Sequence, residues 1–204
     1  MLELGLEALG IFKSRGPSFR RITESDGKQR MGKVFVMVTD TKTDTGNKMK
    51  MVTGESNIHA SIITDKYLRK FYSAAQGKGG FTIETPSVYP ENATFAIYEL
   101  PLPSVDVVKV TAVCLRYASG ALKFTYDIKA ALLGAVGMDV TDGMARGICT
   151  QFVAMVFRAA GVSLFGIPFN ALTAGDFESH PDFKLVGTGT MGTFSKDVSP
   201  ITGK

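Results

Sequence analysis

Residues 147–157 read GICTQFVAMVF, and this stretch predicts a helix that is buried in the core of the protein. Apolar side chains recur in it at the spacing of a helix with a broad buried face: Ile148, Phe152, Val153, Val156 and Phe157. Cys149 falls in the first turn of this predicted helix. Free backbone N–H groups and the positive end of the helix dipole favour the thiolate there, and the thiolate is the nucleophilic form of cysteine. Cys149 is therefore a candidate nucleophile.

The alternative for Cys149 is a small apolar side chain in the core, because free cysteine is among the most often buried residue types. The second cysteine, Cys114, fits that alternative better, since it lies in the middle of a helix predicted for Val107–Ser119. Two cysteines are too few for the disulfide framework of a small secreted domain. The sequence thus favours a reducing, cytoplasmic location.

The chain contains two histidines, so a Cys–His pair has few possible partners. His59 follows a polar turn and begins the β-prone run HASIIT, which would leave its ring free to face a helix end. We expect it to be the catalytic base, with a purely structural histidine as the alternative. His180 lies in the loop ESHPDF, where exposure is expected.

A third group usually fixes the tautomer and orientation of a catalytic imidazole. Glu84, at the end of the β-prone run FTIE, is the first candidate, and Glu99 and Asp65 are the alternatives. A zinc site made of the four cysteines and histidines is not favoured, because none of them are paired at the short spacing typical of zinc ligands. The proposed chemistry needs no metal and no organic cofactor.

The chain upstream of this helix reads mostly as β-structure. Strands are predicted at Val34–Thr39, Met49–Val52, His59–Thr64, Phe81–Glu84 and Thr94–Leu100, the last ended by Pro101, with one helix at Asp65–Gln76. Helical patterns follow at Val107–Ser119, Ile128–Gly137 and Cys149–Ala160. This order favours an α+β fold over alternating βαβ units. The Gly-, Thr- and Ser-rich tail after Phe183 is expected to be loosely held.

Composition places the 204 residues in one globular domain, with 45% hydrophobic and 21% charged residues. The formal net charge of +4 comes from basic residues spread along the chain. The densest basic cluster is Lys13, Arg15, Arg20 and Arg21, which we interpret as a solvated face. Sequence-specific nucleic-acid binding is therefore not expected, and no run is apolar enough to predict a membrane span.

Three motifs in order resemble a known family: a histidine opening a strand (NIHASIIT, 57–64), a strand ending in glutamate (FTIET, 81–85) and a helix headed by cysteine (GICTQFVAMVFRAAGV, 147–162). The later stretch FNALTAGDFESHPDFKLVG, residues 169–187, adds the Gly-Asp pair and aromatic residue of that family's loop. Together they resemble the permuted papain-like cysteine amidases of the YiiX/YaeF type, which are distant relatives of the NlpC-type peptidases.

The resemblance implies a circularly permuted papain-like fold, in which an antiparallel sheet packs against helices that include the Cys-headed one. Residues 1–204 would form one domain, with a β-rich part (1–58), a catalytic core (59–187) and a loose tail (188–204). Cys149 would be the nucleophile, His59 the base and Glu84 the orienting carboxylate of an amide or ester hydrolase acting on peptides, lipids or conjugates. The alternative is an inactive binding or structural module of the same fold, encoded by a phage or another mobile element.

Overall fold

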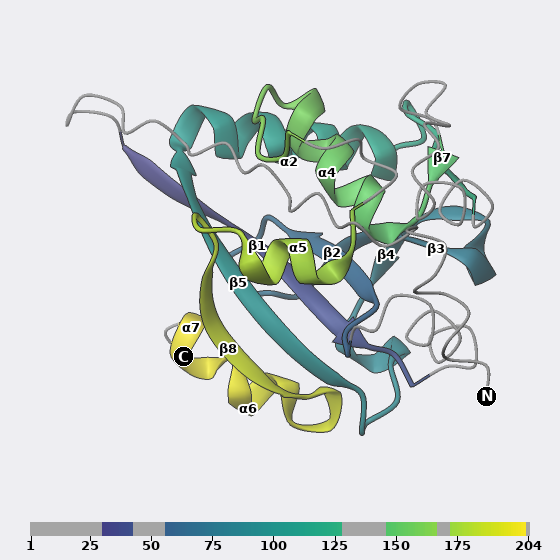
Figure 1. Cartoon of the computed structure of the whole chain (residues 1–204), viewed down its shortest axis with the longest axis vertical. Coiled ribbons are helices and arrows are strands. Elements are labelled where there is room, and N and C mark those ends of the chain that lie inside the picture. Colours follow the sequence, from purple (N-terminus) through teal and green to yellow (C-terminus); the bar gives the residue numbers. More distant parts are fainter. Residues whose placement is uncertain (1–29, 43–55, 128–145, 167–171, 203–204) are drawn as a thin grey trace, which may run out of the picture.

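The computed structural model describes residues 30–42, 56–127, 146–166 and 172–202, and these form an α+β structure (Figure 1). Three sequence features lie outside the described residues: the strand predicted at Met49–Val52, the helix predicted at Ile128–Gly137 and the basic cluster near the N-terminus. The described strands are β1 (Met31–Asp40), β2 (His59–Ile63), β3 (Phe71–Ala75), β4 (Gly80–Glu84), β5 (Thr94–Pro103), β6 (Thr125–Tyr126), β7 (Arg146–Gly147) and β8 (Lys184–Thr190). The α-helices are α2 (Ser104–Ala118), α4 (Cys149–Ala159), α5 (Ala174–Ser179), α6 (Phe194–Asp197) and α7 (Ser199–Thr202).

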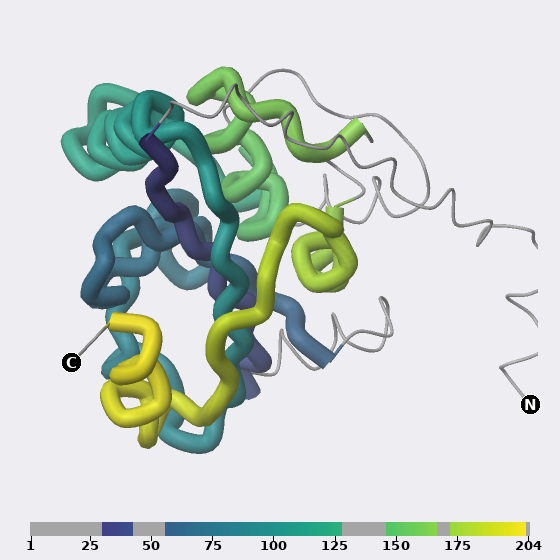
Figure 2. Tube along the Cα trace, turned by 90° about the vertical axis from the view of Figure 1, so that its left-hand side faces the viewer, coloured from purple at the N-terminus to yellow at the C-terminus, as the bar shows by residue number. Residues whose placement is uncertain are grey.

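The strands form one eight-stranded sheet in the order β7-β6-β4-β3-β2-β1-β5-β8. Every neighbouring pair is antiparallel except β6 and β7, which are parallel. Strand β1 pairs with β5 along its whole length, from Met31 opposite Pro103 to Asp40 opposite Thr94. Figure 2 shows β8 running beside β5 at the other edge of the sheet. The α+β class is thus confirmed.

The central strands β1 and β5 are buried on both faces, so the protein has two hydrophobic clusters. Val34, Val36 and Val38 of β1 face the cluster beneath α2 and α4, while Phe35 and Met37 face the opposite cluster. Figure 1 shows α2 and α4 on one side of the sheet and α6 and α7 on the other. Alternation along a strand explains the division, because successive side chains point to opposite faces.

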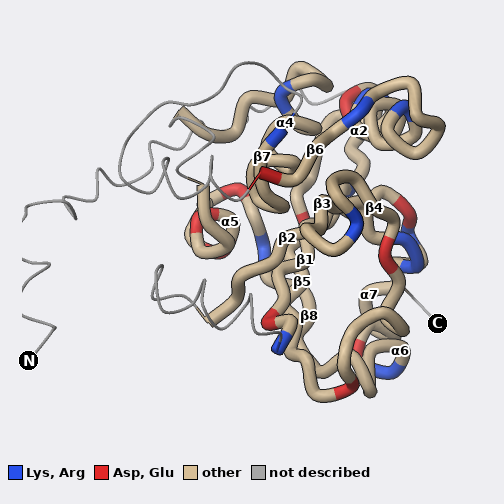
Figure 3. The backbone as a smooth tube through the Cα atoms, turned by 90° about the vertical axis from the view of Figure 1, so that its right-hand side faces the viewer, with Lys and Arg blue, Asp and Glu red and all other residues tan. Residues whose placement is uncertain are grey.

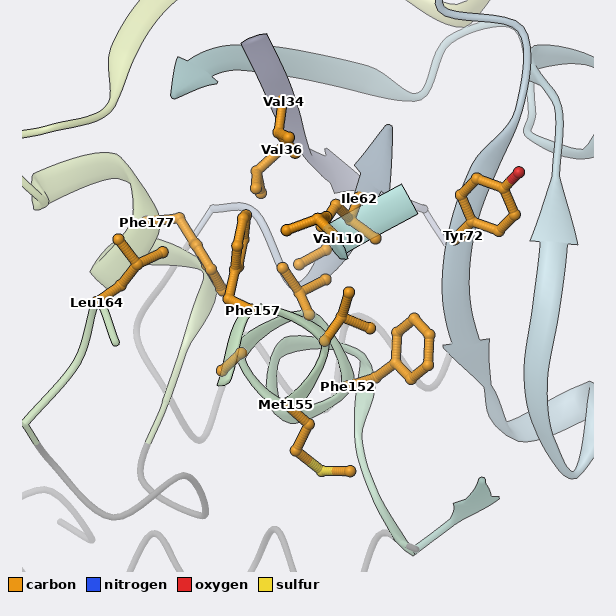
Figure 4. Close-up of a cluster of buried hydrophobic side chains, with 14 of the residues drawn as sticks. Val34, Val36, Ile62, Tyr72, Val110, Phe152, Met155, Phe157, Leu164 and Phe177 are labelled. Carbon is orange, nitrogen blue, oxygen red and sulfur yellow. The ribbon is translucent and has the colours of Figure 1, made fainter. Parts of the chain in front are cut away.

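The helix predicted from GICTQFVAMVF is present as α4, and it lies against β2 and β3. Phe152 is fully buried among three aromatic rings, those of Phe81, Tyr117 and Phe124, with ring centroids 5.1 to 5.6 Å away. Figure 4 shows Phe157 directed from α4 toward Val36 of β1, with Phe152 on the side of α4 nearer to Tyr72 of β3. This packing fixes the position of the N-terminal end of α4, where Cys149 lies.

The predicted helix at Asp65–Gln76 is wrong, because this segment forms a turn followed by strand β3. The Asp65 carboxylate accepts hydrogen bonds from the backbone N–H groups of Tyr67, Arg69 and Lys70, which closes the turn. Leu68 takes a left-handed conformation with φ of 54°, which no α-helix permits. The apolar residues whose spacing resembled a helix are divided between this turn and β3, a strand that is buried along most of its length.

The predicted loose tail is also wrong for the described residues up to 202. Strand β8 pairs with β5, and α6 and α7 pack on the cluster that contains Phe71 and Phe95. A Cβ atom added at Gly187 would lie 2.7 Å from Ile201, so this glycine allows the helix to approach the strand closely. The small residues of the segment therefore permit tight packing instead of indicating looseness.

The strand predicted to end before Pro101 continues to Pro103 as β5. The pairing of β5 with β8 stops at Glu99. Beyond that residue β5 is paired with β1 on one side, and no described strand pairs with its other side. Proline lacks the N–H that an interior strand must donate, and it is tolerated where one side of a strand is open. The absent donor at Pro101 is thus accommodated at the open side.

His180, expected to be exposed, has 1% of its surface exposed and lies between the rings of Phe165 and Phe183. Its Nε2 donates a hydrogen bond to the Leu164 carbonyl, and its Nδ1 accepts one from the Asp182 N–H. Burial lowers the pKa of His180, although the Leu164 carbonyl and the Asp182 charge oppose this effect. His180 is a structural histidine that is held neutral.

We expect His180 to make the protein less stable as the pH falls below about 6.5, the usual pKa of histidine. Because its folded-state pKa is lowered, the unfolded chain binds its proton first, and the free energy of unfolding falls as pH falls through this range. Urea unfolding at pH 7.5 and pH 5.5 measures the effect in the wild type and in His180→Gln. The variant is expected to lose less stability between the two pH values, and an equal loss in both proteins would contradict this role.

Charged residues are spread over the described chain, with Lys and Arg interleaved with Asp and Glu (Figure 3). Four described ion pairs link opposite charges on or near the surface: Lys33–Glu99, Lys42–Asp40, Lys109–Asp106 and Arg146–Asp127. Within the described residues, none of the helices is long and apolar enough to span a membrane.

Candidate active site

Three side chains from three elements come together beside strand β3. Cys149 is the first residue of α4, His59 is the first residue of β2, and Glu84 is the last residue of β4. Strand β3 lies between β2 and β4, and α4 packs against β2 and β3. The structure therefore brings together the three residues selected from the sequence, although 25 positions separate His59 from Glu84.

The start of α4 is built by a local hydrogen bond that positions Cys149. The Gln151 Oε1 atom accepts a hydrogen bond of 2.9 Å from the Ile148 N–H, which caps the first turn of the helix. Gly147 makes room for this cap, because a Cβ atom there would lie 2.2 Å from Gln151 Oε1. Thr150 adds a second anchor by donating a hydrogen bond to the Leu172 carbonyl. Cys149 thus lies at a helix start that two hydrogen bonds hold in place.

Cys149 is buried, with 3% of its surface exposed, and it contacts the strand that carries the histidine. Its Sγ lies 3.7 Å from the Ile58 carbonyl oxygen, to which the thiol form can donate. The backbone N–H groups of Ala60 and Thr150 donate toward the sulfur. Two amide donors aimed at one sulfur favour its anionic form.

The imidazole of His59 is held by hydrogen bonds to Nε2. This atom lies 3.0 Å from Glu84 Oε2, 3.2 Å from Ser73 Oγ and 3.5 Å from Ser61 Oγ. The Ser73 hydroxyl donates its own hydrogen to the Ala60 carbonyl at 2.7 Å, so at Nε2 it acts as an acceptor. The Ser61 hydroxyl likewise donates its hydrogen elsewhere, to Glu84. Since all three partners of Nε2 accept, we assign the proton of the neutral ring to Nε2. This assignment leaves Nδ1 as the ring nitrogen that is available for the hydrogen bond between His59 and Cys149.

Glu84 Oε2 accepts hydrogen bonds from three side chains. The donors are His59, the Tyr89 hydroxyl at 2.5 Å and the Ser61 hydroxyl at 3.3 Å. Burial alone would raise the pKa of Glu84, but the charge of His59 and these hydrogen bonds hold the pKa below its usual value. Glu84 is therefore a buried carboxylate that stays ionised beside the imidazole.

The charges of the three groups reinforce one another. Burial would lower the pKa of His59, but the negative charges of Glu84 and Cys149, and hydrogen bonds to both, raise the pKa to about 10. Burial would likewise raise the pKa of Cys149, but the His59 charge, its hydrogen bond and the two backbone donors lower it. The arrangement favours a thiolate–imidazolium pair supported by a carboxylate.

Cys114 provides a contrast within the same chain. It lies inside α2, fully buried in the cluster beneath the helices, and burial raises its pKa to about 12. The thiol groups of Cys114 and Cys149 are both buried, yet their pKa values move in opposite directions. The difference arises from His59 and the backbone donors, since Cys114 has no histidine or other cation among the groups that shift its pKa.

Four further residues complete the site and were not selected from the sequence. Ser61 and Ser73 contact His59, Tyr89 contacts Glu84, and Tyr126 of β6 lies close enough to Cys149 for the thiolate charge to raise its pKa further, after burial. Ser61 could be found from the sequence, because it lies two residues after His59 on β2. Alternation along a strand places both side chains on the same face. The other three depend on strand pairing and loop placement, which no local pattern predicts.

The alternative orienting carboxylates lie elsewhere. Glu99 forms an ion pair with Lys33 at 2.9 Å, and Asp65 closes the turn before β3. Over the described ranges, no three residues of the types His, Cys, Asp and Glu are grouped so that they could hold a metal ion. Cys114, Cys149, His59 and His180, all described, accordingly form no zinc site.

Comparison with protein-family models, curated proteins and solved structures found no match for this chain.

Proposed function

We propose that the protein is a cysteine hydrolase that cleaves amide or ester bonds through an acyl-enzyme intermediate. The observation that carries this proposal is the ordered contact Glu84–His59–Cys149, in which Nε2 is bound to a carboxylate and the cysteine lies at a helix start. A nucleophile, a base and an orienting acid in that order are the parts of a catalytic triad. We also propose that the α+β structure is of the permuted papain-like kind.

The mechanism begins with the thiolate of Cys149 attacking the carbonyl carbon of the substrate. The tetrahedral intermediate then collapses, and the imidazolium of His59 gives its Nδ1 proton to the leaving amine or alcohol. Neutral His59 next takes a proton from water, which attacks the thioester and releases the acid. Glu84 stays ionised throughout and stabilises each imidazolium that forms.

Two donors are suited to the oxyanion of the intermediate. The backbone N–H of Cys149 lies at the helix start, where α-helices leave their first N–H groups without an intrahelical partner. The Tyr126 side chain of β6 is the second candidate donor, because the charge of Cys149 acts on its hydroxyl. Its raised pKa, caused by burial and by the charge of Cys149, keeps it protonated and able to donate.

The first test is the pH dependence of alkylation by iodoacetamide in the native protein, with the labelled residue identified by peptide mass spectrometry. We expect Cys149 to react well below pH 7, because its pKa is lowered, and Cys114 to stay unlabelled until the protein unfolds. Cys114 thereby serves as an internal control for folding.

The opposite result has a definite meaning. If Cys149 reacts only near pH 8.5, the pKa of an unperturbed thiol, the thiolate–imidazolium pair does not exist and the enzyme proposal fails. The protein would then be a binding or structural module.

A further inference from the structure

We propose that Tyr89 is a positioning residue of this site, and that the C-terminal segment 184–202 holds it in place. This inference rests on the proposed function, since it concerns how the Glu84 carboxylate is kept against His59. Tyr89 does not contact the sulfur, and it acts through Glu84.

The contact between Tyr89 and Glu84 is direct. The Tyr89 hydroxyl donates to Glu84 Oε2 at 2.5 Å, the same oxygen that lies 3.0 Å from His59 Nε2. The tyrosine and histidine rings also lie near each other, with centroids 6.2 Å apart. Glu84 is therefore held between a phenol and an imidazole. Because Ser61 adds a longer contact of 3.3 Å to the same oxygen, Tyr89 is the closest donor to this carboxylate.

Tyr89 remains a donor over the accessible pH range. Burial raises its pKa well above the usual value for tyrosine, and the adjacent Glu84 charge raises it further. A phenol that stays protonated cannot accept the carboxylate's proton, so its contact always stabilises the ionised form of Glu84. The ionised form is the one that favours the imidazolium of His59.

The loop that carries Tyr89 is fixed by the C-terminal segment. The backbone N–H groups of Met191 and Gly192 donate to the carbonyls of Ala93 and Glu91, each at 2.9 Å. Phe71 packs between the two parts, with its ring 6.5 Å from that of Tyr89 and 5.4 Å from that of Phe194. Figure 1 shows α6 on the side of the sheet opposite α4. The segment after β8 thus supports the site from the face away from the nucleophile's helix.

The experiment measures the pH profile of Cys149 alkylation in Tyr89→Phe, which keeps the ring and removes the hydroxyl. We expect the acid limb of the profile to move to higher pH by about half to one unit, because the carboxylate loses one charge-assisted hydrogen bond. Glu84→Gln is expected to move the limb further in the same direction. A purely structural role of Tyr89 would change the unfolding temperature without moving this limb.

Tyr98→Phe is the matched control, because the Tyr98 hydroxyl also donates to a carboxylate, that of Glu178. Its alkylation profile is expected to coincide with that of the wild type. Labelling of Cys114 reports the unfolded fraction in each protein, so a folding defect is recognised directly.

Two results would overturn the inference, and they are distinguishable. If the wild type reacts at low pH and Tyr89→Phe gives the same profile, Tyr89 has no positioning role and the proposed function stands. If Cys149 of the wild type itself reacts only near pH 8.5, the proposed function fails and this inference fails with it.

Discussion

Replacement of His59 by alanine is expected to slow the alkylation of Cys149 at pH 6 by at least about 100-fold. Without the imidazolium, Cys149 keeps the burial that raises its pKa and loses the charge that lowers it. A thiol with a pKa of about 8.5 has well under 1% thiolate at pH 6, and the thiolate is the species that reacts. The measurement is the second-order rate constant for iodoacetamide, with the labelled residue identified by mass spectrometry.

Two further variants separate this effect from a loss of folding. His59→Gln keeps a side chain able to donate to Glu84, so the buried carboxylate is not left unpaired, yet it cannot bear the positive charge. It should slow the reaction as His59→Ala does. His180→Gln changes the other histidine, which is bound to Leu164 and Asp182, and should leave the rate constant within about twofold of the wild type. Equal rate constants in the wild type and His59→Gln would remove His59 from the mechanism.

The parts of the site that could be predicted from the sequence are those with a local signal. The apolar period of residues 147–157 predicts a helix, and a helix start is a position at which cysteine becomes reactive. His59 and Glu84 each lie at an end of a short β-prone run, a position that the sequence itself shows. Their choice as candidates needed no knowledge of strand pairing, but their contact depends on it, because β2 and β4 run in the same direction on either side of β3.

The remaining parts depend on long-range pairing. Ser73 reaches His59 because β3 lies beside β2, yet β3 falls within a segment whose apolar spacing resembles a helix. The spacing of apolar residues does not distinguish a helix from a strand there, since a strand buried on both faces shows no alternation of polar and apolar residues. Asp65 decides between the two structures by closing a turn, which is a contact of its side chain and not a property of the apolar pattern.

The C-terminal segment differs from its prediction for another reason. Its glycines and threonines resemble a flexible tail, because small and polar residues bury little apolar surface by themselves. In β8 the glycines leave room for close neighbours, and a Cβ atom at Gly189 would lie 2.0 Å from Asp197 Oδ2. Composition cannot distinguish a glycine that allows close packing from one that allows motion. The sequence therefore does not predict that this segment packs behind the loop that carries Tyr89.

Replacement of Cys149 by serine is expected to slow the hydrolysis of p-nitrophenyl acetate by at least about 1000-fold. Serine differs from cysteine by one atom, so the contacts with Ile58 and with the Ala60 and Thr150 amides remain available. A hydroxyl is a far weaker acid than a thiol, and the His59–Glu84 pair, tuned to stabilise a thiolate, cannot hold an alkoxide beside it. Removal of a nucleophile costs several orders of magnitude where the catalytic groups act as a unit.

The measurement follows the release of p-nitrophenol and the mass of the trapped protein. The wild type should show a burst and then steady turnover, with the acetyl group on Cys149, because His59 activates water for the second step. Cys114→Ala is the matched control, since that thiol is buried and its raised pKa keeps it inert, and it should hydrolyse the ester as the wild type does. Equal hydrolysis by Cys149→Ser and Cys114→Ala would show that the ester is cleaved elsewhere on the protein. A burst without turnover would mean that Cys149 is a reactive thiol whose acyl form the site cannot hydrolyse, which would contradict the water-activating role given to His59.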